Sequence, residues 1–521
     1  MFRQVIPVTV KIYHTKIKKE KEEKMLIKTI LLLLFFGSMV IVGLYSRKHV
    51  KSVNDFVLGG RGVGPWLTAF AYGTSYFSAV VFVGYAGQFG WKYGISATWI
   101  GIGNALIGSL LAWLVLGKRT RNMTKHFGST TMPDFFGKRF DSKNLKIASS
   151  VIVFVFLIPY TASIYNGLSR LFALAFDIPY WVCVIVMAVL TGVYVIMGGY
   201  VATAINDFIQ GIIMLFGIVA VIIAVLNGQG GFVEAFRKLG EVPSAEIAVN
   251  GQSGAFASIF GPDPLNLLGV VILTSLGTWG LPQMVHKFYA IKDDKAIKTG
   301  TIISTVFAIV ISGGCYLLGG FSRLFDGPEI YNNSAVVFDS IIPHMLSNLP
   351  DILMGIVIVL VLSASMSTLS SLVLTSSSTF TLDFLKDNFV KDMKIKTQLN
   401  VMKVLVAVFV ALSVILALDP PTFIAQLMGI SWGALAGSFL APFLYGLYWK
   451  GVTKAAVWAC FITGVGITVS NMFINYIASP INAGAIAMVV GFIIVPVVSF
   501  ITPKMQKEKV EDAFSCLKKS N

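Results

Sequence analysis

Charged residues are scarce in this 521-residue chain: they make up only 13% of it, against 55% for hydrophobic residues. The mean hydropathy is +0.78. A soluble protein of this length could not cover so much apolar surface with so few charges. The apolar runs are about 20 residues long, enough for a helix to cross ~30 Å of hydrocarbon, which favours helices over a barrel. The composition therefore predicts an all-α polytopic membrane protein.

The sequence lacks the residue patterns that several kinds of chemistry require. Cys183, Cys315, Cys460 and Cys516 show no CxxC spacing, so neither a disulfide framework nor a metal site is indicated. The five His are isolated, no GxxxxGK[ST] motif occurs, and no loop is long enough for a nucleotide-binding domain. These absences argue against redox machinery and ATP-driven pumps. We expect no catalytic residues and no enzymatic activity.

Thirteen spans are predicted, and together they define a transmembrane transporter domain at 25–503. A basic extension at 1–24 precedes this domain, and a tail at 504–521 follows it. The spans fall near 26–45, 66–88, 94–117, 148–174, 180–197, 202–226, 265–286, 299–321, 352–382, 399–417, 422–448, 453–476 and 484–503, with an inverted-repeat core at about 66–448.

Lys and Arg residues set the expected orientation. Alternate loops and the tail hold twenty-eight of them, whereas the loops on the other side hold only Lys92, Arg237, Lys238 and Arg323. This bias predicts a multi-pass plasma-membrane protein with a cytoplasmic C-terminus and an extracytoplasmic N-terminus. The extension at 1–24 carries KIKKEKEEK and breaks the rule, so we interpret it as non-native or disordered, with Met25 as the initiator.

Two predicted spans are interrupted in the middle. The second contains Gly73-Thr74-Ser75, and the seventh contains Gly277, Gly280 and Pro282 within six residues. Interrupted helices at corresponding positions of two halves indicate the substrate and ion site of a secondary transporter. These two are five spans apart, and an odd offset reverses the membrane direction, so the halves are expected to be inverted repeats.

The ninth predicted span gives up apolar surface for hydroxyls: residues 363–379 read SASMSTLSSLVLTSSST, with eleven Ser or Thr among seventeen. Helical periodicity places Ser367, Thr368, Ser370 and Ser371 on one face. Hydroxyls and carbonyls without several carboxylates suit a sodium ion better than calcium. Asp207 is the only acid expected well inside the membrane part, and such a residue predicts function.

Five segments together resemble the sodium/solute symporter family, nearest to its bacterial sodium/proline and pantothenate-like branch. They are GGRGVGPWLTAFAYGTSYFSA, MPDFFGKRF, GGYVATAINDFIQ, GLPQMVHKFYA and SASMSTLSS, and the resemblance runs from about 50 to 450. It implies a LeuT-type five-plus-five inverted repeat with about 13 transmembrane helices. It also implies sodium-coupled import of a small organic solute by alternating access.

The resemblance also implies ion ligands. A first sodium ion would be held by the carbonyls of Thr74, Phe77 and Ala364 and by the hydroxyls of Ser367 and Thr368. A possible second sodium site, similar to that of sialic-acid carriers, would consist of Asp207, Ser370 and Ser371. Sodium is the only cofactor or metal expected. We predict two sodium ions per solute.

The chain departs from the proline carriers at three positions. Tyr76 stands where those carriers have aspartate, and Thr274 and Thr278 stand where they have aromatic residues. The solute is therefore left open between an amino acid such as proline and a carboxylate such as pantothenate or a monocarboxylate. The alternatives are a sugar-type sodium symporter and a channel or sensor with the same fold but no coupled transport.

The substrate is expected at the breaks of spans two and seven. The candidate lining residues are Tyr72, Tyr76, Tyr160, Tyr165, Asn166, Thr278, Trp279, Gln283 and Trp432. Arg170 is expected to extend toward the interface instead. The expected partners are this small molecule and the lipid bilayer, without nucleic acid, and the chain is expected to function as a monomer.

Overall fold

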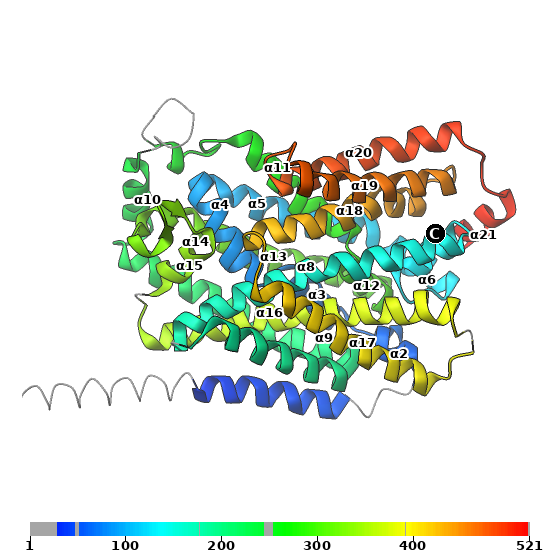
Figure 1. Cartoon of the computed structure of the whole chain (residues 1–521), viewed down its shortest axis with the longest axis horizontal. Helices are drawn as coiled ribbons and strands as arrows, with labels where there is room; N and C mark the ends of the chain where they lie inside the picture. The colour runs from blue at the N-terminus through cyan, green and yellow to red at the C-terminus, as the bar shows by residue number, and fades with distance from the viewer. Residues whose placement is uncertain are drawn as a thin grey trace, which may run out of the picture.

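The computed structural model describes residues 29–46, 52–176, 178–243, 254–347, 349–390 and 392–518. The predicted extension at 1–24 and the predicted initiator Met25 lie outside these residues. Helices dominate the described chain, and they pack into one elongated bundle (Figure 1).

The first half of the bundle follows a helix at Thr29–Ser46. Its α-helices are α2 (Val53–Leu58), α3 (Pro65–Tyr76), α4 (Ala86–Tyr93), α5 (Thr98–Gly103), α6 (Lys118–Phe127), α7 (Met132–Arg139), α8 (Lys143–Phe176), α9 (Tyr180–Gly228) and α10 (Phe232–Glu241). The second half contains α11 (Pro264–Leu276), α12 (Pro282–Ala290), α13 (Asp294–Ala308), α14 (Gly314–Gly320), α15 (Phe338–Ser347), α16 (Asp351–Thr379), α17 (Ile395–Leu418), α18 (Ile424–Tyr448), α19 (Lys454–Ile474), α20 (Pro480–Ile501) and α21 (Lys507–Lys518).

Shorter segments connect or interrupt these helices. The π-helical ones are η2 (Val80–Tyr85), η4 (Asn104–Leu111), η5 (Trp113–Gly117), η8 (Ile309–Gly313) and η11 (Phe380–Lys386). The 3₁₀ turns are η1 (Gly59–Arg61), η3 (Gly94–Ala97), η6 (Ala255–Ala257), η7 (Gly277–Gly280), η9 (Ser322–Phe325) and η10 (Pro328–Ile330). Strands β1 (Tyr331–Asn332) and β2 (Ala335–Val336) form a small antiparallel hairpin, with Tyr331 paired to Val336.

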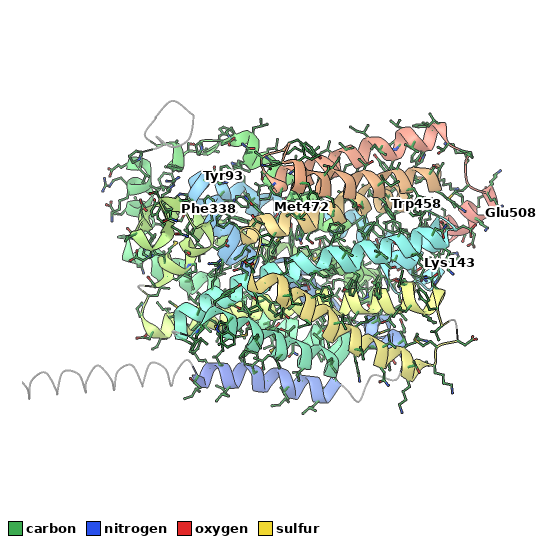
Figure 2. The ribbon with its side chains drawn as sticks, in the orientation of Figure 1. Tyr93, Lys143, Phe338, Trp458, Met472 and Glu508 are labelled. Carbon is green, nitrogen blue, oxygen red and sulfur yellow. The ribbon has the colours of Figure 1, made fainter. Side chains whose placement is uncertain are left out.

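The long helices run roughly parallel to the long axis of the bundle, which therefore has two ends (Figure 1). The α21 end, on the right, carries α6 and α21, and Lys143 and Glu508 lie there (Figure 2). The α15 end, on the left, carries α4, α10, α14 and α15, with Tyr93 and Phe338 (Figure 2). These two names are used below for the two sides of the predicted membrane domain.

Ten described helices are long and apolar enough to cross a membrane, or eleven if the bent pair Pro264–Gly280 and Pro282–Ala290 is one span. The thirteen predicted spans and the spans of the structure have different boundaries. The second and third merge after α3 into one 48-residue apolar run, Val80–Phe127, and the fifth gives the shorter apolar helix Tyr180–Val193. The chain is a multi-pass membrane protein.

Glycines lie at two of the boundaries between predicted spans. Gly94 caps α4 with a φ of +62°, and Gly199 bends α9 with a φ of +58°. A side chain is disfavoured at such angles. A Cβ at Gly199 would also lie 2.8 Å from the ring of Phe56. Close packing against α2 therefore places the bend of α9 at this residue.

Helix α16, the predicted serine helix, lies in the interior of the bundle. The most apolar window of Asp351–Lys386 is 78% buried and that of Ile424–Tyr448 is 94% buried, against 33% for Ile395–Leu418. Helix α16 packs on α3, α8, α9 and α12. A helix surrounded by protein does not need an apolar face for lipid, which explains why α16 can carry so many hydroxyls.

An ion-pair network ties three elements together at the α21 end. The Lys146 Nζ atom of α8 lies 2.7 Å from Asp134 Oδ1, 3.2 Å from Asp383 Oδ1 and 2.6 Å from Asp387 Oδ2. The Thr131 hydroxyl donates to Asp383 Oδ2 over 2.5 Å. Burial alone would raise the pKa of Asp134, but the ammonium groups of Lys146 and Lys138 hold it below the usual value for an aspartate. The network therefore joins α7, α8 and η11.

Lys146→Met should destabilise the protein by about 3 kcal/mol, because it leaves the buried Asp383 carboxylate without its ammonium partner. Denaturant unfolding of the purified protein in detergent measures this loss. Because the pKa of Asp134 is lowered in the fold, the wild-type advantage should be present at neutral pH and shrink as the pH falls. Lys143→Met, at an exposed position three residues earlier, is the matched control. Equal stability of the two variants would contradict the prediction.

Candidate functional site

The two predicted interruptions are present. Helix α3 stops at Tyr76, where Phe77 takes an extended conformation with φ −112° and ψ 103° before η2 begins. Helix α11 gives way to the turn η7, and the chain then restarts at Pro282 as α12, bent by 45°. Helix α3 packs against α12, α13 and α16, so the first break lies beside the serine helix, whereas the turn η7 of the second break packs mainly against α18.

Several hydroxyls of α16 donate to carbonyls of their own helix. Ser365, Ser370 and Ser377 donate to the carbonyls of Val361, Ser367 and Val373 over 2.6, 2.8 and 2.7 Å. Such bonds are usual for serine in a buried helix. Ser367, Thr368 and Ser371 differ, because their hydroxyls reach α3. The serine-rich stretch therefore contains a short segment, Ser367 to Ser371, in which three hydroxyls contact another helix.

The residues predicted for the first sodium ion lie together. The Ser367 hydroxyl donates to Thr74 Oγ1 over 2.7 Å. The Thr368 hydroxyl lies 3.1 Å from the Thr74 carbonyl and 3.0 Å from the Ala364 carbonyl. Phe77 and Ala364 line one small cavity, and all five residues are buried. Helix α3 ends here, so its last carbonyls lack the helical partners that an uninterrupted helix would supply.

Two of the residues predicted for the second sodium ion contact a buried lysine, Lys287, which the sequence did not place in the membrane. Asp207 Oδ2 lies 4.0 Å from the Nζ atom of Lys287, and this Nζ donates to Ser371 Oγ over 2.9 Å. Ser371 Oγ lies 2.8 Å from Ser75 Oγ. Ser370 donates to its own helix instead. Lys287 is part of GLPQMVHKFYA and directly follows the seventh predicted span, so its charge counts among the twenty-eight Lys and Arg of the basic loops and tail. Its side chain is in fact only 2% exposed.

Asp207 is also not the only interior acid. Asp383 at the α21 end and Asp339 at the α15 end are both 1% exposed. Asp339 lies 3.9 Å from Arg170, so Arg170 pairs with an acid instead of reaching for the interface. Burial raises the pKa of Asp339 to about 6, although Arg170 acts in the opposite direction. The partners in the Lys146–Asp383 and Arg170–Asp339 pairs lie far apart in the sequence, so the sequence does not predict either pair.

Three of the predicted substrate residues have their polar ends occupied by backbone. The hydroxyl of Tyr72 donates to the Gly108 carbonyl and that of Tyr76 to the Thr274 carbonyl, each over 2.6 Å. The Trp279 indole donates to Ile107 over 3.0 Å. A fourth, Thr278, donates within its own turn to Ser275 over 2.9 Å. These side chains brace the interrupted helices.

Three other predicted residues keep unpaired polar groups. The hydroxyl of Tyr160, the indole nitrogen of Trp432 and both amide atoms of Gln283 are buried without a hydrogen-bond partner among the described residues. The ring of Trp432 lies 5.8 Å from Tyr160 and 6.2 Å from Tyr76, between centroids. Buried polar atoms without partners are uncommon and mark a place for a ligand or water.

The last two predicted residues, both on α8, also keep one unpaired polar atom each. The hydroxyl of Tyr165 and the amide nitrogen of Asn166 are buried without a hydrogen-bond partner among the described residues. The side-chain oxygen of Asn166 accepts from Arg170 over 2.6 Å. The structure thus brings Tyr76, Tyr160 and Trp432 together, whereas Asn166 belongs to the Arg170–Asp339 group.

Comparison with known proteins shows the family of the chain. The family model described as "Sodium:solute symporter family" matches residues 56–464. The chain belongs to the sodium:solute symporter family. It is therefore a transporter with sodium as its coupling ion, and it moves a small organic solute by symport. The resemblance of the five sequence segments is confirmed.

Known relatives match this chain over nearly its whole length. It is 29% identical over 493 residues to the osmoregulated proline transporter OpuE of Bacillus subtilis, covering 92% of this chain and 95% of that one. It is also 29% identical over 512 residues to the sodium/proline symporter of Staphylococcus aureus (strain JH9), covering 92% and 93%.

Solved structures share the fold. A sodium-coupled sialic acid symporter, in a substrate-bound outward-open state, superposes with a TM-score of 0.76 at 17% identity, covering 92% of this chain and 98% of that one. Mhp1, a nucleobase-cation-symport-1 family transporter, gives a TM-score of 0.51 at 13% identity, covering 88% and 97%. The predicted LeuT-type inverted-repeat fold is confirmed.

Proposed function

We propose that this symporter imports a small amino acid or carboxylic acid together with sodium by alternating access. Residues 25–503 would form one transporter unit, and a single chain would suffice because it carries both interrupted helices. The α21 end would face the cytoplasm, which the excess of Lys and Arg at that end supports. The extracytoplasmic placement of the N-terminus belongs to the same proposal.

The first sodium ion would bind where α3 stops. The carbonyls of Thr74, Phe77 and Ala364 and the hydroxyls of Ser367 and Thr368 offer uncharged oxygen ligands, and four of these residues are already joined by hydrogen bonds of 2.7–3.1 Å. Half-helix ends with free carbonyls hold sodium in transporters with interrupted helices. Because α3 and α16 supply different ligands, the ion would hold the two helices together.

The solute would bind beside the unpaired groups of Tyr160, Gln283 and Trp432, and this observation carries the proposal. Gln283 lies in the first turn of α12, whose N-terminus favours negative charge. A carboxylate placed at that turn would meet the helix dipole and the Gln283 amide. An amino group or a neutral tail would pack on the rings of Tyr76 and Trp432.

Two departures from the proline carriers contact each other. Tyr76 stands where those carriers have aspartate, and its hydroxyl donates to the carbonyl of Thr274, which stands where they have an aromatic residue. Compared with the proline carriers, this chain has a larger residue at position 76 and a smaller one at position 274. The two changes together alter the polarity of the site more than its volume. Proline, the solute in the names of both relatives, is one candidate, and pantothenate and monocarboxylates are the others.

Uptake into proteoliposomes tests the proposal. Proline, pantothenate, lactate and glucose are each offered to the reconstituted protein with and without an inward sodium gradient, after a thermal-shift screen of the purified protein. Saturable, sodium-dependent uptake of one of the three acids is the expected result. Sodium-driven glucose uptake would favour the sugar-type alternative, and unsaturable uptake without sodium coupling would favour a channel.

Ser367→Ala/Thr368→Ala should weaken sodium activation of uptake at least tenfold, about 1.4 kcal/mol, because it removes two oxygen ligands and their link to Thr74. The sodium concentration for half-maximal uptake measures the effect. Ser365→Ala/Ser377→Ala on the same helix is the matched control, since those hydroxyls bond only to their own turns. Unchanged sodium activation in the first double variant would refute the site.

Gln283→Leu should raise the KM for the solute about tenfold while leaving the protein as stable as the wild type or more so. The wild-type amide has no hydrogen-bond partner among the described residues, so its removal costs the empty protein nothing. Gln210→Leu, a buried amide on α9 that faces Met39, is the control and should leave KM unchanged. A loss of stability without a change in KM would make Gln283 a structural residue.

A further inference from the structure

Four buried polar side chains meet where α3, α9, α12 and α16 converge. They are Ser75, Asp207, Lys287 and Ser371, each at most 4% exposed. Each residue comes from a different helix, and α3 and α12 are the two interrupted ones. The group therefore sits between the interrupted helices and their neighbours, one turn of α16 away from Ser367 and Thr368.

The Lys287 ammonium occupies the centre of this group. It donates to Ser371 over 2.9 Å, lies 4.0 Å from Asp207 Oδ2 and sits 5.3 Å from the centroid of the Tyr200 ring. Neither oxygen of Asp207 has a hydrogen-bond partner within the described chain, so Lys287 supplies its charge partner. A hydroxyl, a carboxylate and an aromatic face are the surroundings that suit a bound monovalent cation.

We propose that the Lys287 ammonium takes the place of a second sodium ion, so that one sodium ion is bound per chain. This inference rests on the proposed first sodium site and replaces the expectation of two ions per solute. The reason is charge balance: Asp207 can neutralise one cation, and a sodium ion beside Lys287 would leave an extra buried positive charge. Ser371, expected to be an ion ligand, already accepts from Lys287.

The position of Lys287 on α12 determines which helices its ammonium holds together. The ammonium arrives from the interrupted span, whereas Asp207 and Ser371 belong to α9 and α16. A resident cation on a side chain holds these helices together without leaving with the solute. At zero voltage and a tenfold sodium gradient, one coupled ion limits solute accumulation to about tenfold, and two ions to about a hundredfold.

Equilibrium binding of ²²Na⁺ to the purified full-length protein tests the inference without knowledge of the solute. The wild type should bind one ion per chain with a Hill coefficient of one. Lys287→Ala frees space and charge beside Asp207, so it should bind two ions per chain. Adding Asp207→Asn to Lys287→Ala should return the number to one. Lys292→Ala, at an exposed position past the end of α12, should stay at one.

Two ions bound to the wild type would overturn the inference, and so would a single ion bound to a folded Lys287→Ala protein. If Lys287→Ala does not fold, Lys287→Gln takes its place, with the same two outcomes. Failure of the proposed first site gives a different pattern: the wild type would bind no sodium, while the Lys287 variant would still gain one ion.

Discussion

The fold depends on two helices that stop inside the membrane, where every freed backbone group needs a new partner. The side chains around the breaks provide these partners. The Thr368 hydroxyl donates to the Thr74 carbonyl and the Tyr76 hydroxyl to the Thr274 carbonyl, while the Trp279 indole ties the second break to the carbonyl of Ile107 in η4. Much of the polarity in the centre of the bundle is therefore structural. The proposed solute site consists of the polar groups that this bracing leaves unpaired.

The sequence predicts the breaks and the serine face because both depend on local chemistry. Gly277, Gly280 and Pro282 stand within six residues, and the chain turns by 45° there. A Cβ at Gly280 would lie 2.8 Å from the backbone of α18, so this glycine also allows close packing. The hydroxyls of Ser367 and Thr368 share a helical face, and both contact α3.

The buried charge pairs could not be predicted in the same way, because depth depends on how helices are placed in space. Lys287 lies next to a basic loop in sequence, and only the turn of α12 brings it inside. Arg170 lies near a helix end, and its partner Asp339 is 169 positions away. A lysine or arginine near the end of an apolar run looks the same whether it reaches water or a buried acid.

The buried pairs at both ends of the bundle involve the same helix. Helix α8, 34 residues long, carries Lys146 near its first turn and Arg170 near its last. Lys146 meets Asp383, which follows α16, and Arg170 meets Asp339 of α15. If α8 moves away from either neighbour, a buried carboxylate loses its charge partner, which destabilises the protein. The middle pair, Asp207 and Lys287, joins α9 to α12 without α8. The end pairs can therefore be broken one at a time while the centre remains neutral.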